Sequence, residues 1–203
     1  PYELMSFYDN HDMPRLQASD NGFIDAHNWL FTARGIPVVY YGSETGFMRG
    51  RAEHAGNRAY FGQARVDAAP QSPIFAPLRR IAQLRQATPA LQRGLQVNER
   101  LRGNEAVFFR VLQQGDVAQT ALVLLNKGDK ATVFQVERYL QAGRWRDALD
   151  GGSLQVDASL KAEVPAHGVK VYVLDASVQQ PALQAELDRA MADQKARDQR
   201  LGR

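Results

Sequence analysis

Two acids, an amide and an imidazole stand side by side near the start of the chain, in the run Asp9-Asn10-His11-Asp12. The apolar and aromatic run just before them, residues 3 to 8, is typical of a strand buried on both faces. Parallel α/β folds place their functional groups just beyond the carboxyl ends of strands, so the run is a candidate functional site. The alternative is a strand-end cap, in which the Asp oxygens accept backbone N–H groups and the His is a half-buried ring.

The backbone path decides whether His11 and Asp12 can act together. Strict strand alternation would place the two side chains on opposite faces. They reach one pocket only if the chain leaves the strand at this point, which the following Met13-Pro14 pair permits.

A helix and a second strand are expected to follow. Cap-type residues at 19–21, then apolar residues at helical spacing, then Gly35, predict a helix over about 19–34. The β-branched and aromatic run 37–41 predicts a second buried strand, and strand, helix, strand implies a parallel pair with a crossover. Such a unit leaves its sheet edges unpaired and its faces bare, so we expect more chain before Pro1.

Further along, the pattern changes twice. Residues 45–71 show no sustained periodicity and predict a long loop, while Ser72-Pro73 and an apolar stripe predict a helix that stops before Thr88-Pro89. From about residue 95, short β-rich stretches alternate with turn signals, which favours an antiparallel sandwich. The expected strands are 106–112, 120–125, 132–136, 154–156 and 169–174. The tail from Gln179 predicts a helix, either docked on its own domain or frayed in solvent.

Composition removes several function classes. The 25 Lys and Arg are balanced by 22 Asp and Glu and are spread along the chain, so no nucleic-acid partner is predicted. The absence of cysteine excludes disulfides and thiolate metal sites. No apolar run approaches the roughly 20 residues that span a bilayer, so no membrane partner is expected. The four histidines, at 11, 27, 54 and 167, show no metal-ligand spacing, and no metal site is predicted.

Two motifs resemble conserved regions of the α-amylase superfamily, glycoside hydrolase family 13. The first is Phe7-Tyr-Asp-Asn-His-Asp12, and the second, about 25 residues further on, is Ala33-Arg-Gly-Ile-Pro-Val-Val-Tyr-Tyr-Gly-Ser-Glu44. Their order, each on a predicted strand, makes the signal specific. With the helix around 75–91 and the β-rich segment behind it, they look most similar to cyclodextrin glycosyltransferases and bacterial maltogenic amylases. The resemblance covers about residues 3 to 175.

The resemblance implies an α/β part followed by an all-β part. Residues 1–90 would be strands seven and eight, with their helices, of a catalytic (β/α)8 TIM barrel. Residues 91–176 would form the antiparallel β-sandwich domain usual at the C-terminal side of these enzymes, and 177–203 a helical or disordered tail. The partner that completes the barrel would be polypeptide ahead of Pro1.

The resemblance also implies roles for single residues. Asp12 matches the third catalytic carboxylate of the family, which hydrogen-bonds sugar hydroxyls and favours the oxocarbenium-like transition state. His11 matches the neighbouring hydroxyl-binding histidine. Asn57-Arg58 is similar to the end of a sugar-binding loop of the type Asp-Pro-x-x-Asn-Arg, although the Asp-Pro element is missing here. Arg58 is therefore a candidate substrate contact, and an ordinary solvated loop arginine is the alternative.

Three other residues are expected to be structural. Glu44 ends the second motif, at a position that the resemblance makes structural and not catalytic. Trp29 and Trp145 are candidates for stacking on sugars, but a single Trp on a helix or strand more often serves packing.

A retaining glycosidase needs a nucleophilic carboxylate, an acid that protonates the leaving oxygen, and groups that stabilise the transition state. No motif here matches the first two, so the segment alone is predicted inactive. It would be part of a retaining α-1,4-glucan hydrolase or transglycosylase acting on starch or malto-oligosaccharides, and the two reactions are not distinguished. The alternative is a non-catalytic glucan-binding or structural fragment. No cofactor is expected within the segment; any Ca²⁺ would be held by the missing part, and a secreted or periplasmic location is favoured over a cytoplasmic one.

Overall fold

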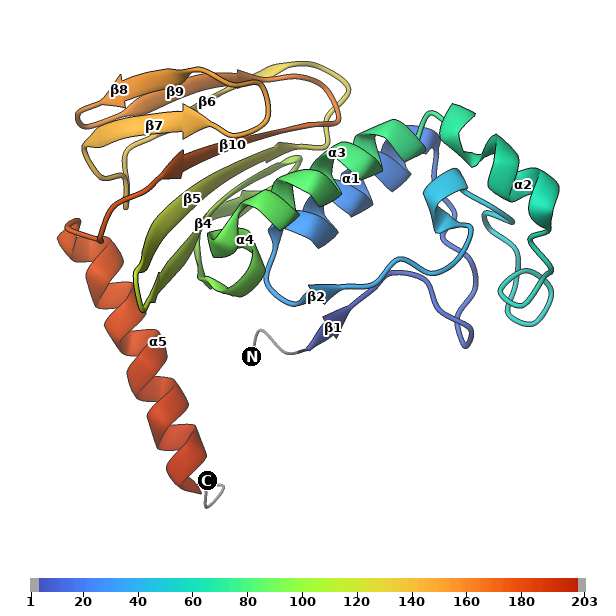
Figure 1. Ribbon diagram of the computed structural model, residues 1–203, viewed down its shortest axis with the longest axis horizontal. Helices are drawn as coiled ribbons and strands as arrows, with labels where there is room; N and C mark the ends of the chain where they lie inside the picture. Colours follow the sequence, from blue (N-terminus) through green and yellow to red (C-terminus); the bar gives the residue numbers. More distant parts are fainter. Residues whose placement is uncertain (1–3, 201–203) are drawn as a thin grey trace.

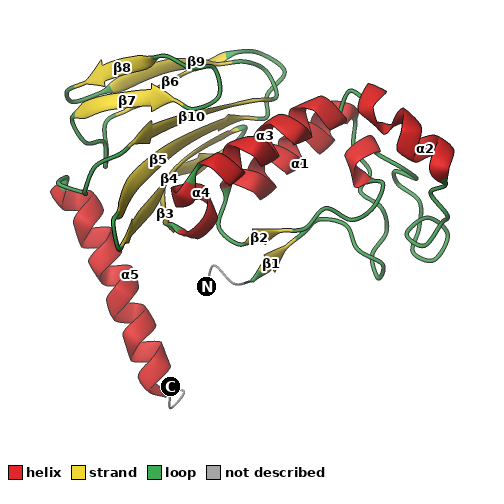
Figure 2. Cartoon of the chain, in the orientation of Figure 1, coloured by secondary structure: helices red, strands yellow, loops and turns green. Residues whose placement is uncertain are grey.

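The computed structural model of the protein describes residues 4–200. Its first half is a β–α–β unit followed by a helical stretch (Figures 1 and 2). Strands β1 (Met5–Ser6) and β2 (Ile36–Pro37) pair in parallel and are joined by helix α1 (Asp20–Thr32). The remaining helical elements of this half are η1 (Ser43–Thr45), α2 (Gln63–Ala68), η2 (Ala69–Gln71), α3 (Phe75–Ala87) and α4 (Pro89–Arg93).

Local sequence accounts for α1 and for the crossover. The hydroxyl of Ser19 accepts a hydrogen bond from the backbone N–H of Gly22 at 3.2 Å, which confirms the predicted N-cap. Past the helix end, Gly35 has a φ of 107°, which favours glycine. A Cβ at Gly35 would also lie 2.1 Å from the hydroxyl of Ser6, so glycine lets β2 approach β1. The predicted parallel crossover is confirmed.

The second half is antiparallel. One sheet has six strands in the order β3-β4-β5-β10-β7-β8, and β6 pairs with β9 in a two-stranded sheet. The strands are β3 (Leu95–Arg102), β4 (Glu105–Gln114), β5 (Val117–Asn126), β6 (Thr132–Val136), β7 (Gly143–Asp147), β8 (Ser153–Val156), β9 (Leu160–Val164) and β10 (Gly168–Leu174).

The six-stranded sheet is covered on both faces. On one face, Phe109 joins Phe134 and Trp145 in a core shared with the β6–β9 pair. On the other, Phe108 packs in a second core with Ile81 and with residues of α4. Helix α4 lies beside β4 on this face (Figure 1). Double coverage explains why β4 and β5 are buried almost continuously and do not alternate.

The tail forms helix α5 (Pro181–Arg200). Leu183 and Leu187 are buried in the core shared by the two sheets, whereas Met191 is exposed. The helix then extends away from the body of the molecule (Figure 1). The predicted tail helix is confirmed, with its first half docked and its second half in solvent.

The predictions of buried strands at 3–8 and 37–41 are wrong in length and in burial. β1 and β2 have two residues each, and apolar side chains in and beside them are exposed: Leu4, Met5, Phe7 and Ile36. The reason is that no neighbouring element within residues 4–200 buries these four side chains, whereas Ser6 and Pro37 are half-buried. Within the same range the two parallel strands close no barrel.

Other boundaries also differ from the predictions. Helix α3 begins at Phe75 instead of Pro73, because the hydroxyl of Ser72 accepts from the N–H of Ile74 in a turn that precedes the helix. The segment 45–71, predicted as a loop, contains α2 and η2. The predicted strand list lacks β3, β7 and β9, although β9 buries every second residue.

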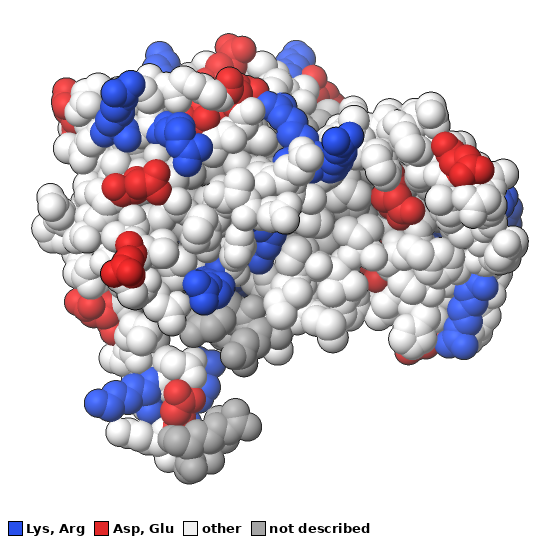
Figure 3. All heavy atoms as spheres, in the orientation of Figure 1, with Lys and Arg blue, Asp and Glu red and all other residues white. Residues whose placement is uncertain are grey.

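Charged groups of both signs are interspersed over the face shown in Figure 3. No helix within residues 4–200 is both long and apolar enough to cross a membrane.

Candidate active site

His11, Asp12 and Arg58, the three residues predicted to form the site, lie together. The Nε2 of His11 is 3.0 Å from one carboxylate oxygen of Asp12, and Nη2 of Arg58 is 3.0 Å from the other. The Nε of Arg58 also donates to the carbonyl of His11 at 3.2 Å. The side chains of His11 and Asp12 are both 61% exposed, so these polar groups face solvent and are accessible to a ligand.

The chain turns sharply between β1 and Pro14. The side-chain oxygen of Asn10 accepts a hydrogen bond from the backbone N–H of Asp12 at 2.8 Å, which closes a local turn. Because residues 11 and 12 belong to this turn and not to β1, their side chains come to the same side. The condition for His11 and Asp12 to act together, that the chain has left the strand at this point, is therefore met.

Asp9 has a different environment from Asp12. It is buried, and its two oxygens accept from the backbone N–H of Leu16 at 2.7 Å and from the hydroxyl of Ser43 at 2.8 Å. Asp9 is therefore the strand-end cap that the alternative interpretation predicts. Asp12 keeps its carboxylate at the surface, so the four-residue run combines a structural acid with an accessible one.

A buried cation, Arg15, lies behind the site. Its guanidinium donates to the carbonyls of Tyr41 at 2.9 Å and Gly56 at 3.3 Å, and its carbon lies 4.6 Å from the ring centre of Tyr40. These contacts join the 9–16 segment to the stretch after β2. No local pattern marks Arg15 in the sequence, since its partners come from residues 40–56.

Asn57 joins the two loops of the site. It is fully buried, and its amide donates to the carbonyls of His11 at 2.6 Å and Met13 at 3.1 Å. Its side-chain oxygen accepts from the N–H of His54 at 2.8 Å. This side chain fixes the loop that presents Arg58 to the 11–13 turn. The Asn-Arg pair in the sequence pointed to Arg58, and the positioning role of Asn57 was missed.

The partly buried Tyr8 and the buried His27 lie close to this segment, with a hydrogen bond between the phenol and Nε2 of His27. Burial lowers the pKa of His27 to about 4 and raises the pKa of the Tyr8 phenol. His27 is therefore neutral at neutral pH and contributes to packing. No group of three or more His, Asp or Glu residues within residues 4–200 is placed to hold a metal ion.

The two tryptophans, Trp29 and Trp145, differ in how far they are buried. Trp145 is fully buried, and its indole N–H donates to the carbonyl of Gln141 at 3.0 Å, which confirms the expected packing role. Trp29 packs edge to face on Phe108 at a centroid distance of 5.6 Å, yet it is 41% exposed.

Comparisons with known proteins show what this chain is similar to. A cyclomaltodextrin glucanotransferase of Paenibacillus macerans is 29% identical over 153 residues, covering 73% of this chain and 20% of that protein. An α-amylase of Niallia circulans is 28% identical over 166 residues, covering 77% of this chain and 30% of that protein. The crystal structure of the α-amylase from Geobacillus thermoleovorans, complexed with acarbose, matches 88% of this chain and 40% of its own with a TM-score of 0.72 and 26% identity. Cyclomaltodextrin glucanotransferases and α-amylases are homologues of this chain.

These homologues confirm the resemblance seen in the two sequence motifs. The chain spans about a fifth of the length of the cyclomaltodextrin glucanotransferase and under a third of that of the α-amylase. It thus corresponds to one part of such a protein. No protein-family model matches the chain.

Proposed function

We propose that this chain is part of a retaining α-1,4-glucan hydrolase or transglycosylase acting on starch or malto-oligosaccharides. In this proposal Asp12 stabilises the transition state, and His11 and Arg58 bind substrate. The observation that supports it best is an exposed carboxylate held between an imidazole and a guanidinium, just past a parallel strand, in a chain homologous to such enzymes.

The geometry of Asp12 suits recognition of sugar hydroxyls. One carboxylate oxygen faces His11 and the other faces Arg58, so the carboxylate is oriented before a substrate arrives. Together the three side chains offer one acceptor group between two donors, and neighbouring hydroxyls of a pyranose match such a set. Preorganised polar groups contribute most when their contacts strengthen in the transition state.

The rest of the catalytic machinery lies outside this chain in the proposal. A nucleophilic carboxylate and an acid are required, and they would come from polypeptide that packs on the exposed apolar groups of β1 and β2. The same polypeptide would hold any calcium ion. Export from the cytoplasm fits an enzyme that acts on starch. Whether water or a sugar accepts the glycosyl group depends on that part as well.

The test is to purify the full-length product of the gene and to incubate it with maltoheptaose. Mass spectrometry should detect shorter, cyclic or elongated glucans. Asp12→Asn should lower kcat by about a hundredfold or more, because a preorganised transition-state contact is lost. Its melting temperature should stay close to that of the parent, since the Asp12 side chain is largely exposed.

Asp9→Asn is the matched control, since it makes the same chemical change at the buried neighbour. It should lower the melting temperature, because Asp9 holds Leu16 and Ser43. Full activity of Asp12→Asn would refute the assignment. Unchanged maltoheptaose with the parent protein would favour the rival proposal, a non-catalytic glucan-binding or structural fragment.

A further inference from the structure

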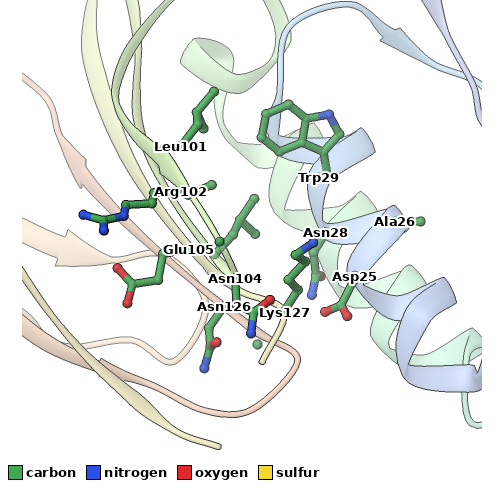
Figure 4. A pocket seen from close by; sticks show the side chains of 14 residues that line it. Asp25, Ala26, Asn28, Trp29, Leu101, Arg102, Asn104, Glu105, Asn126 and Lys127 are labelled. Carbon is green, nitrogen blue, oxygen red and sulfur yellow. The ribbon is translucent and has the colours of Figure 1, made fainter. Parts of the chain in front are cut away.

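The edge strand β3 borders two concave surfaces. Near its end, Leu101 faces Trp29 of α1 across the first of them (Figure 4). The first residues of β3 face α5 across the second, which we call the α5–β3 groove. The α5–β3 groove has a volume of about 690 Å³, and none of His11, Asp12 and Arg58 lines it. It is therefore separate from the candidate active site.

The second half of α5 has little contact with its own domain. Leu183 and Leu187 dock the helix, but from residue 188 to residue 200 every residue except the partly buried Asp198 is exposed. Most helical stability in proteins comes from packing, and a helix of this length is marginal in water by itself. Hydrogen bonds within the helix, such as that from Gln194 to Asp198 at 2.7 Å, add little each. We therefore expect this half of the helix to have a partner.

The α5–β3 groove reaches the amino ends of the two parallel strands. Arg34, which lines the groove, stands two residues before Ile36, the first residue of β2. The carbonyl of Leu4 accepts from the N–H of Ile36, and Met5 of β1 follows Leu4. The side chains of Leu4, Met5 and Ile36 are exposed. The helix and the parallel pair thus border one uncovered surface.

The neighbouring helices indicate on which side of β1 and β2 a partner would lie. In a (β/α)8 barrel the helices lie outside the ring of strands. Figure 1 shows α1 and α3 on one side of the β1–β2 pair, whereas α5 extends past the amino ends of these strands toward the other side. The proposed remainder of the barrel would therefore occupy the space next to the second half of α5.

The charged groups of the α5–β3 groove suit such a neighbour. Within residues 4–200, the side chains of Arg34, Asp193 and Arg197 form no hydrogen bond or ion pair, and all three line the groove. In a barrel, the loops at the amino ends of the strands follow the carboxyl ends of the helices, which carry a partial negative charge. The two arginines complement that charge. Ala190, which also lines the groove, leaves room for a close approach.

We propose that the second half of α5 docks on the amino-end face of the barrel, against polypeptide that precedes Pro1, with Arg197 facing the carboxyl end of a barrel helix. This inference rests on the proposed function, from which it takes the barrel. Active sites of (β/α)8 barrels lie at the opposite face, at the carboxyl ends of the strands. The docked helix therefore stabilises the enzyme without contacting the reacting groups.

Hydrogen exchange followed by mass spectrometry on the full-length product of the gene tests the docking. Arg197→Glu should make the amides of residues 191–199 exchange about tenfold faster than in the parent, because it sets a negative charge against the helix end. Lys195→Glu is the matched control, since it makes the same change of charge on the same helix at a residue that does not line the groove. Its exchange should stay close to that of the parent.

A second pair of variants tests the close approach without relying on the charge of Arg197. Ala190→Glu sets a bulky side chain in the groove and should also speed exchange of residues 191–199. Ala192→Glu, its matched control, makes the same change at an exposed residue that does not line the groove. If neither Arg197→Glu nor Ala190→Glu differs from its control, α5 is not docked. Protection that rises with protein concentration would mean that a second copy covers the helix, and it would also refute the proposal.

Turnover of maltoheptaose separates this inference from the proposed function. Arg197→Glu should keep the kcat and KM of the parent, because the amino-end face lies away from the catalytic one. Protection of α5 that depends on Arg197, in a parent without any turnover, would uphold the docking and refute the catalytic assignment. Turnover by a parent whose α5 exchanges as fast as in Arg197→Glu and Ala190→Glu would refute the docking alone.

Discussion

At the scale of single residues, the buried Asn57 holds the loops of the candidate site together through its side-chain hydrogen bonds. Its buried amide serves two carbonyls, those of His11 and Met13, and one N–H, that of His54. Asn57→Ala leaves these groups without partners, so we expect a loss of about 1–3 kcal/mol in the free energy of unfolding, measured by urea denaturation.

Asn57→Asp is the informative companion variant. It is nearly isosteric and keeps an acceptor for the N–H of His54, but it sets a carboxylate oxygen against the carbonyls of His11 and Met13. It should therefore destabilise at least as much as Asn57→Ala. A variant as stable as the parent would show that these hydrogen bonds contribute nothing net.

How far the sequence predicts the site depends on the range of each contact. His11, Asp12 and Arg58 could be named because they stand in recognisable motifs. Asp9 and Arg15 could not be assigned their roles, because Ser43 and Tyr41, their partners, lie 34 and 26 residues away. Burial makes Asp9 a structural acid and leaves Asp12 accessible. The sequence does not reveal which acid is buried, because both stand in the same short motif.

At the scale of elements, the end of α1 is stabilised by arginines from elsewhere in the chain. The helix has no basic residue in its last turn. Arg85 of α3 donates to the carbonyls of Phe31 and Ala33 at 2.9 and 3.2 Å, and Arg110 of β4 donates to that of Thr32 at 2.7 Å. The partial negative charge of the helix end compensates for burying these cations.

Arg110→Met tests this arrangement. The variant keeps an apolar stem but removes the donors for the carbonyls of Thr32 and Gly94, so we expect a loss of about 1–3 kcal/mol in the free energy of unfolding. Arg79→Met, an equal change at an exposed position of α3, should stay within about 0.5 kcal/mol of the parent. Urea denaturation of both variants checks the difference. Equal stability of the two would refute the capping role.

Elements were predictable where local pattern and tertiary context agree. β4, β5 and β10 are long runs of apolar and β-branched residues, and the structure confirms them. β7 was missed because its one large apolar residue, Trp145, stands between two arginines, and only the core around it shows that the strand is needed.

At the scale of the whole molecule, His167 connects the two halves. Its Nδ1 is 2.8 Å from Asp25 of α1, and its Nε2 is 3.0 Å from Asp129 in the turn after β5. The hydrogen bond with Asp25 is the main cause that raises the pKa of His167 above its usual value, and Asp129 adds to it, while burial raises the pKa of Asp25. Lys127 is a further charged group near Asp25.

This linkage makes stability depend on pH. A histidine whose pKa is raised on folding stabilises the protein fully below its unfolded pKa of about 6.5, and that contribution is lost as the pH rises through the folded pKa. In the variant His167→Asn, the asparagine tolerates the positive φ of 52° at this position, but its side chain cannot be protonated. Its melting temperature should be lower than that of the parent by about 2–4 °C near pH 6, with a smaller difference near pH 9. A difference that does not change with pH would exclude the charged pair as its cause.

The two halves should also differ in how well their backbone hydrogen bonds resist exchange with solvent. The β1–β2 pair is joined by bonds such as Ile36 N–H to the Leu4 carbonyl and Val38 N–H to the Ser6 carbonyl, both 2.9 Å, and apolar side chains around it are exposed. β4 and β5 pair over ten residues and lie between two cores. Amides with few buried contacts open locally, whereas those of a core sheet open only with global unfolding.

Hydrogen exchange followed by mass spectrometry on the 203-residue chain should therefore show the amides of Ile36 and Val38 exchanging orders of magnitude faster than those inside β5. In the full-length product of the gene, the proposed remainder of the barrel would pack on β1 and β2. It should slow amide exchange in these two strands, while the exchange rates in β5 should change little. Fast exchange at Ile36 and Val38 in that protein too would mean that nothing covers the pair, and the barrel proposal would fail on structural grounds independent of any assay of activity.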